Sequence, residues 1–233
     1  MKILFAQVII SCSLVKSAEI YRIDESIEIL EDESIEIEPK ESSPDKNVLN
    51  LFMIGDWGGP HAENGGPAQD EYGFSIGNGM NELSKKMNLD GILLLGDNIY
   101  NEGVDDVFDE RWETTYQATF NGTNLKTTKM YATSGNHEYF KNVSAMIEYT
   151  QYDPTRRWTY PDYWYNVKFL DGRVELLMID TSALLGHYAW ENYPENRKPT
   201  DLEERQWIQY QWIQEKLKNS TAEILLVGAH CQR

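Results

Sequence analysis

Residues 91–100, Gly-Ile-Leu-Leu-Leu-Gly-Asp-Asn-Ile-Tyr, join a short apolar run to a turn that carries Asp97 and Tyr100. The run has the length and the bounding glycines of a fully buried strand. In open α/β sheets, functional groups collect at the carboxyl ends of the strands. We therefore expect Asp97 and Tyr100 to lie at a sheet edge where a ligand binds.

Similar runs recur along the chain and set the expected fold. Strands are expected at Val48–Ile54, Ile92–Leu95, Met130–Thr133, Val174–Ile179 and Glu223–Val227. Amphipathic stretches between them predict one helix over Phe74–Met87 and another from a capping box at Thr200 to about Leu217. Strand–helix alternation predicts a layered α/β domain. On the second helix, the apolar pattern assigns Trp207 and Trp212 to the core.

Metal-binding side chains follow four of these strands. The segments are Gly55-Asp56-Trp57-Gly58-Gly59, Gly96-Asp97-Asn98-Ile99-Tyr100, Gly135-Asn136-His137-Glu138 and Val227-Gly228-Ala229-His230. One glycine–aspartate pair is common in ordinary turns, whereas four strand ends that are each followed by such side chains indicate a functional site. Carboxylate, phenolate, amide and imidazole donors favour iron, zinc or manganese. A carboxylate that bridges two ions, flanked by separate ligands, indicates a two-metal site, and the phenolate points to ferric iron at one position.

In this order, GDWGG, GDNIY, GNHE and VGAH resemble the purple acid phosphatases of the metallophosphoesterase superfamily, most closely the small secreted tartrate-resistant type. Asn142-Val143-Ser144-Ala145 and Arg157-Trp158 extend the resemblance, which covers about Val48 to His230. It implies a layered metallophosphoesterase-like β-sandwich flanked by helices. The chain is identified on these motifs as a member of that family.

The resemblance also implies a set of metal ligands. Asp56 and Tyr100 would bind Fe(III), and Asp97 would bridge the two ions. Asn136 and His230 would bind the second ion, which is Fe(II) or Zn(II).

The implied reaction is the hydrolysis of phosphate monoesters by a dinuclear metal-activated hydroxide. His137 would contact phosphate or assist the leaving group, and the substrates would be small phosphomonoesters or phosphoproteins. Two alternatives stay open. The first is a catalytically impaired secreted product that acts only as a binding protein, and the second is another metallophosphoesterase such as a phosphodiesterase. Tyr100 argues against the second alternative.

The end of the chain departs from the family pattern. The family closes its site with a downstream Gly-His-x-His motif, whereas this chain stops at Arg233, three residues after His230. It therefore carries five of the seven ligand residues expected, because His61 and His187 do not match that motif. We expect the last strands of the fold to be missing, the strand Glu223–Val227 to lack a neighbour, and the activity to be impaired.

Charge and the N-terminal residues constrain location and partners. The net charge of −17 disfavours nucleic acid and anionic membrane surfaces, and we expect a monomer. Residues 1–17, with Lys2 and the apolar Ile3–Val15, have the pattern of a secretory signal peptide. Residues 18–47 contain an acidic eight-residue repeat and are expected to be a disordered spacer or propeptide. The domain proper spans 48–233, and we expect a secreted or lysosomal glycoprotein.

Overall fold

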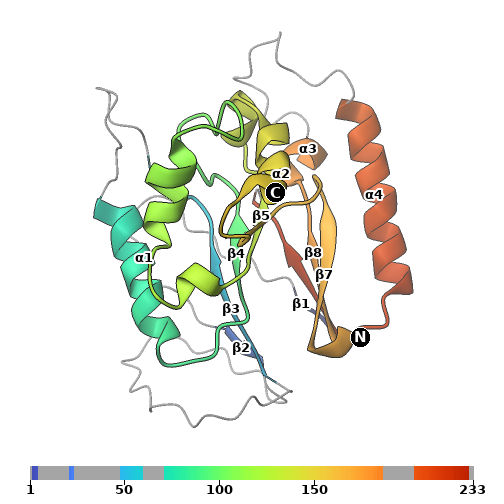
Figure 1. Ribbon diagram of the computed structural model, residues 1–233. Coiled ribbons are helices and arrows are strands. Elements are labelled where there is room, and N and C mark those ends of the chain that lie inside the picture. The colour runs from blue at the N-terminus through green and yellow to red at the C-terminus, as the bar shows by residue number, and fades with distance from the viewer. Residues whose placement is uncertain (1, 5–20, 24–47, 60–70, 186–201, 231–233) are drawn as a thin grey trace.

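The computed structural model describes residues 2–4, 21–23, 48–59, 71–185 and 202–230. Within these ranges the strands form two sheets, and helices lie on the outer sides of both (Figure 1). Helices α1 and α4 lie on opposite sides of the pair of sheets (Figure 1). This confirms the predicted layered α/β fold.

The first sheet has five strands in the order β2-β3-β4-β5-β6. The bounds are Tyr21–Ile23, Leu49–Ile54, Gly91–Leu95, Met130–Thr133 and Trp158–Thr159. Strands β3 to β6 are parallel, and β2 is antiparallel to β3. Every residue of β4 is buried, as its continuous apolar run predicts. Parallel pairing brings the carboxyl ends of β3, β4 and β5 to one edge.

The second sheet has four strands in the order β1-β9-β8-β7. Their bounds are Lys2–Leu4, Ile224–Gly228, Val174–Met178 and Tyr165–Phe169. The expectation that β9 would lack a neighbour is wrong for the chain that carries residues 2–4, because β1 pairs with β9 in parallel on the side away from β8. The five predicted strands match β3, β4, β5, β8 and β9 to within one residue at each end.

In the described part of the chain, four α-helices complete the layers, with the bounds Glu71–Ser84 (α1), Val143–Tyr152 (α2), Thr181–Leu185 (α3) and Leu202–Asn219 (α4). A π-helical segment, Trp112–Gln117, and three short 3-10 segments, Leu125–Thr127, Glu138–Phe140 and Leu170–Gly172, lie in the connections. The predicted apolar side of α1 is confirmed for Met80, which is buried, and for Ile76 and Leu83, which pack against the core. Met87 also packs against the core, but α1 ends at Ser84, three residues before the predicted end.

The prediction that Trp207 belongs to the core is wrong. Its side chain is 60% exposed, and Trp212 is only half-buried. Helix α4 is held instead through Gln209, which is fully buried. The Gln209 amide accepts a hydrogen bond from the backbone N–H of Asp180 (2.8 Å) and donates to its carbonyl (3.1 Å). The inner side of the helix is therefore held by the buried Gln209 amide, and Trp207 lies on the opposite side.

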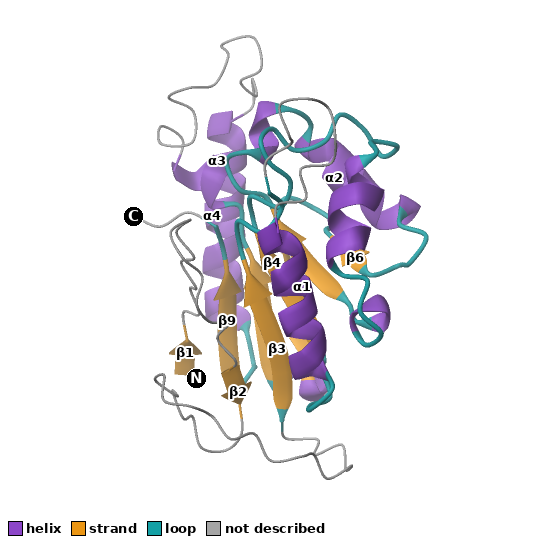
Figure 2. Ribbon diagram, turned by 90° about the vertical axis from the view of Figure 1, so that its left-hand side faces the viewer, coloured by secondary structure: helices purple, strands orange, loops and turns teal. Residues whose placement is uncertain are grey.

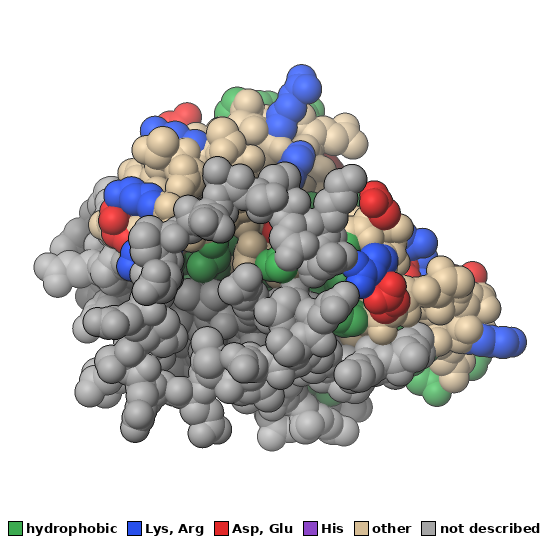
Figure 3. Space-filling view, turned by 90° about the horizontal axis from the view of Figure 1, so that it is seen from below, with side chains coloured by type: hydrophobic (Ala, Val, Ile, Leu, Met, Phe, Trp, Pro, Cys, Tyr) green, Lys and Arg blue, Asp and Glu red, His purple; other side chains and the backbone are tan. Residues whose placement is uncertain are grey.

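The predicted signal peptide and acidic segment lie outside the described residues apart from β1 and β2, so both stay predictions. His61 and His187 also lie outside the described residues. No helix in the described part of the chain has the length and apolar character needed to cross a bilayer. Where described side chains are visible from below, basic and acidic groups lie beside one another (Figure 3).

Asp153 organises the turn between α2 and β6. It is 3% exposed, and its carboxylate accepts backbone hydrogen bonds from Thr155 (2.9 Å), Arg157 (2.9 Å) and Trp158 (2.8 Å). Trp158 thereby enters an aromatic cluster in which it meets Tyr116 with ring centroids 5.2 Å apart. Burial opposes the charge on Asp153, but the hydrogen bonds that it accepts, first that from the Thr155 side chain, lower its pKa.

Replacing Asp153 by asparagine tests this role. Asp153→Asn should lower the free energy of unfolding at neutral pH by about 1–3 kcal/mol, since an amide cannot accept all of these bonds. The pKa of Asp153 is lowered in the folded state, so its stabilisation is complete above the usual value of 3.8 and is lost as the pH falls through the lowered pKa. Urea unfolding at several pH values measures the difference. A difference that stays constant into strong acid would contradict this assignment.

Candidate metal centre

Three predicted ligands from both sheets meet at one point. Asp56 follows β3, Asp97 follows β4 and His230 follows β9, and one donor atom of each lies within 4.8 Å of the others. Strands β3 and β9 point toward the same end of the molecule, where the loops gather (Figure 2). Carboxylate oxygens and an imidazole nitrogen at this spacing form a group that can hold a metal ion.

Tyr100 lies between the two carboxylates. Its hydroxyl oxygen is 2.6 Å from Asp56 Oδ1 and 2.7 Å from Asp97 Oδ2. One phenolic hydrogen can be directed fully at only one of these acceptors. Burial, followed by the charge of Asp97, raises the pKa of Tyr100, and burial raises that of Asp56. Two carboxylates and a phenol that favours its neutral form thus lie together, and a bound cation would stabilise the ionised form of each group. The donor set therefore fits a metal.

His230 is oriented by the backbone of β4. Its Nδ1 lies 2.8 Å from the carbonyl oxygen of Leu95, and its Nε2 lies 3.3 Å from Asp97 Oδ1. Burial disfavours the imidazolium, but the hydrogen bond to Asp97 and the charges of Asp97, Asp56 and Glu138 together outweigh it and raise the pKa of His230 to about 9. A carbonyl on Nδ1 leaves Nε2 as the metal-binding nitrogen, which is the usual orientation of a histidine ligand.

His137 lies next to Asp97 and is partly exposed to solvent. Its backbone N–H donates to Asp97 Oδ1 (3.0 Å), and its Nε2 lies 3.7 Å from Asp97 Oδ2. The other ring nitrogen, Nδ1, is 2.6 Å from the carbonyl oxygen of Asn101. The side chain is 31% exposed, so a ligand can reach the ring. Asn136, the remaining predicted ligand, is half-buried and directly precedes His137 in the same loop.

Glu138 is a site residue to which the sequence analysis assigned no role. It is fully buried, and its carboxylate accepts backbone N–H groups from Gly135 (2.5 Å), Asp97 (3.0 Å), Asn98 (2.6 Å) and Ile99 (3.2 Å). Burial, followed by the charge of Asp97, raises its pKa to about 7. In the sequence, the position of Glu138 at the end of the GNHE motif was the signal that could have pointed to this role. Its contacts join the loop after β4 to the loop after β5.

Glycine is required where these loops touch. A Cβ on Gly135 would lie 2.1 Å from Asp97 Oδ1, and a Cβ on Gly58 would lie 1.8 Å from the carbonyl oxygen of Asn98. Both distances are far below van der Waals contact. Gly96 has φ +88, a conformation that residues with a Cβ rarely adopt. The predicted turn glycines thus allow the loops that carry the candidate ligands to pack closely.

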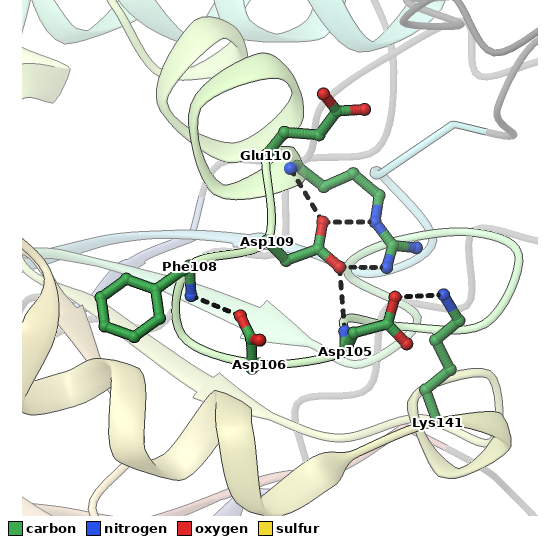
Figure 4. Close-up of a pocket in the computed structure, with 7 residues that line it drawn as sticks. Asp105, Asp106, Phe108, Asp109, Glu110 and Lys141 are labelled. Atoms are coloured by element: carbon green, nitrogen blue, oxygen red, sulfur yellow. Dashed lines mark hydrogen bonds and ion pairs between the residues drawn. The ribbon is translucent and has the colours of Figure 1, made fainter.

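An open pocket is lined by residues of the segment 105–111 and by Lys141 (Figure 4). Asp109 forms a salt bridge with Arg111 and accepts the backbone N–H of Asp105, whose carboxylate pairs with Lys141 at 2.9 Å. Lys141 directly follows the short helix Glu138–Phe140. These contacts support the loop that carries His137.

Comparison with known proteins decides the family. Residues 49–232 match the family described as calcineurin-like phosphoesterase. The chain belongs to the calcineurin-like phosphoesterase family. The ligand group of Asp56, Asp97 and His230 lies within the matched residues.

Individual relatives of this calcineurin-like phosphoesterase are acid phosphatases by name. It is 30% identical over 188 residues to tartrate-resistant acid phosphatase type 5 of Sus scrofa, a match that covers 78% of this chain and 53% of the relative. The Homo sapiens protein of that name is 29% identical, with 78% and 56% covered. Purple acid phosphatase 7 of Arabidopsis thaliana is 26% identical, with 61% and 40% covered. The chain thus spans about half the length of its curated tartrate-resistant relatives.

Among solved structures, the fold is similar to that of GAP50, the anchor in the inner membrane complex of Plasmodium. The TM-score is 0.59 at 19% sequence identity, with 78% of this chain and 54% of the other covered. This similarity supports the fold.

Adding one methyl group at Gly135 tests the packing of the metal loops. Gly135→Ala should displace Asp97 and weaken metal binding by at least about tenfold, the size of effect that outer contacts of a metal site commonly have. Gly79→Ala is the matched control, since a Cβ at Gly79 meets nothing within 4 Å. Metal titration by calorimetry measures both. Equal affinities for the two variants would contradict the close packing around Asp97.

Proposed function

We propose that this calcineurin-like phosphoesterase is an acid phosphatase that hydrolyses phosphate monoesters at a two-metal site. The observation that carries the proposal is the Tyr100 phenol between the carboxylates of Asp56 and Asp97. A phenolate with two carboxylates is a hard anionic donor set suited to Fe(III). The acid phosphatases among the relatives support the same reaction.

We propose Asp97 as the ligand that would bridge the two ions. Its Oδ2 lies 2.7 Å from the Tyr100 hydroxyl, whereas its Oδ1 lies 3.3 Å from His230 Nε2. The two oxygens therefore face different ligand groups. We assign Asp56, Tyr100 and Asp97 to Fe(III), and Asp97, Asn136 and His230 to a second ion, Fe(II) or Zn(II). When bound, such ions act as Lewis acids and lower the pKa of water, so that hydroxide is available in acidic solution.

His137 is the proposed catalytic residue of this chain. Because its Nδ1 faces the Asn101 carbonyl, its Nε2 is the atom left for a substrate. In acidic medium a protonated ring can hold a phosphate oxygen or donate a proton to the departing alkoxide. We propose small phosphomonoesters or phosphoproteins as substrates, because phosphate monoesters supply both the oxygen and the leaving group that these residues would bind.

The activity test uses the full chain loaded with iron alone or with iron and zinc. We expect hydrolysis of 4-nitrophenyl phosphate in acid, at least about tenfold faster than hydrolysis of the bis(4-nitrophenyl) diester. Chelation should abolish it. Preference for the diester would instead support a phosphodiesterase. Metal binding without turnover would support the binding-only alternative and contradict the catalytic proposal.

Two variants test the residue roles within the same experiment. Tyr100→Phe should remove the visible absorption of an iron–phenolate pair, with the exposed Tyr152→Phe as the matched control. His137→Ala should lower turnover by about 100-fold, a typical contribution of general acid–base catalysis. Its metal content should stay that of the unmodified protein, and loss of an ion in this variant would show that His137 is a ligand.

We propose that the chain follows the secretory route, supported by the signal-like residues 1–17. The acceptor asparagines of its three glycosylation triplets, Asn121, Asn142 and Asn219, are all exposed. Expression in eukaryotic cells should deliver the chain to the medium with a mass that falls after enzymatic deglycosylation. An unmodified chain retained in the cells would contradict this route.

A further inference from the structure

The outer side of α4 exposes a row of aromatic residues. Trp207 is 60% and Tyr210 is 48% exposed, and their rings stack with centroids 6.2 Å apart. Ile208, beside them, is 45% exposed. Gln214 donates a hydrogen bond to the Tyr210 hydroxyl (3.0 Å), which extends the row toward the end of the helix. Exposed apolar groups that gather in this way mark interaction surfaces.

This row is not needed to hold α4 on the domain. The inner side of the helix is attached through Gln209, through the Gln206 amide, which donates to the Ala183 carbonyl (2.8 Å), and through Arg205 over the Tyr163 ring (4.3 Å). Helix α4 also lies at the outer side of the molecule (Figure 1). The contacts that attach α4 to the other described residues therefore come from its inner side.

The charges at the two ends of the row are opposite. Glu203, Trp207, Tyr210, Gln214 and Lys218 follow at spacings of four, three, four and four residues, which places them along one side of the helix. Each of them is exposed. The acid lies in the first turn and the base in the last turn. If two such helices lie antiparallel, the acidic end of each row therefore faces the basic end of the other.

Helix α4 is also electrically balanced. Its three acids and three bases are Glu203, Glu204, Glu215, Arg205, Lys216 and Lys218. The whole chain, in contrast, has a net charge of −17. Two copies would repel each other over much of the surface, whereas two copies of α4 would not. The balanced charge favours a second copy of this chain as the partner.

In place of the monomer expected from the sequence, we propose that two copies of this chain associate through α4, antiparallel about a two-fold axis. Glu203 of each copy then lies opposite Lys218 of the other, and Trp207 lies over Gln214 of the other. Such self-complementary contacts are characteristic of two-fold dimers, and aromatic residues are enriched at interface centres. A helix of 18 residues is about 27 Å long, so the contact is small and the dimer is weak and concentration-dependent.

Analytical ultracentrifugation of the full chain, from low micromolar to several hundred micromolar, tests the association. We expect a monomer–dimer equilibrium. Joint replacement of Trp207 and Tyr210 by alanine should raise the dissociation constant by at least about tenfold. The matched control replaces Phe108 and Tyr152, another exposed aromatic pair with centroids 5.8 Å apart, by alanine. A monomer at all concentrations, or equal effects of the two double variants, would overturn the proposal.

Charge reversal tests the antiparallel arrangement. Glu203→Lys alone and Lys218→Glu alone should each weaken the dimer by about threefold or more, because each sets like charges opposite one another. The double variant should restore it. Glu148→Lys, on the exposed side of α2, makes the same charge change elsewhere and should leave the dimer unchanged. Failure of the double variant to restore association would overturn the antiparallel pairing. Circular dichroism checks that every variant stays folded.

Discussion

The carboxylate of Glu138 is the contact on which the candidate metal centre depends. It accepts backbone N–H groups from the loop after β4 and from the loop after β5, at 2.5 to 3.2 Å. A buried carboxylate without such partners would cost several kcal/mol, on the order of the whole stability of a domain. These bonds therefore hold the two loops at one separation. Asp97 lies in the first loop and His137 in the second, so the spacing of both follows from Glu138.

The centre exists because two sheets meet at their carboxyl ends. The first sheet supplies Asp56, Asp97 and Tyr100, whereas His230 comes from β9 of the second sheet. The Leu95 carbonyl, at the end of β4, orients the His230 ring, so a backbone group of one sheet orients the ligand from the other. The arrangement concentrates acidic groups that repel one another, which is the condition under which a bound cation stabilises a site.

The two sides of α4 show that aromatic content does not by itself decide which side of a helix is buried. The buried contact is the amide of Gln209, which satisfies both backbone groups of Asp180. Such a pair removes two polar groups from water without leaving either unsatisfied. The opposite side of α4, with Trp207 and Tyr210, is exposed and is the surface that we propose for contact with a second copy of the chain.

Part of this structure could be predicted from the sequence. Mostly apolar runs predicted β3, β4, β5, β8 and β9, because strands of a sheet that is covered on both faces carry predominantly apolar side chains. The donors after these strands indicated a metal site, because parallel strands end at a common edge. Strand β7 and helix α2 were not predicted. The role of Glu138, the carbonyl that orients His230 and the outward side of Trp207 are set by contacts between residues distant in sequence. Only the tertiary structure decided them, since a local pattern does not specify which distant group will satisfy a buried carboxylate, imidazole or amide.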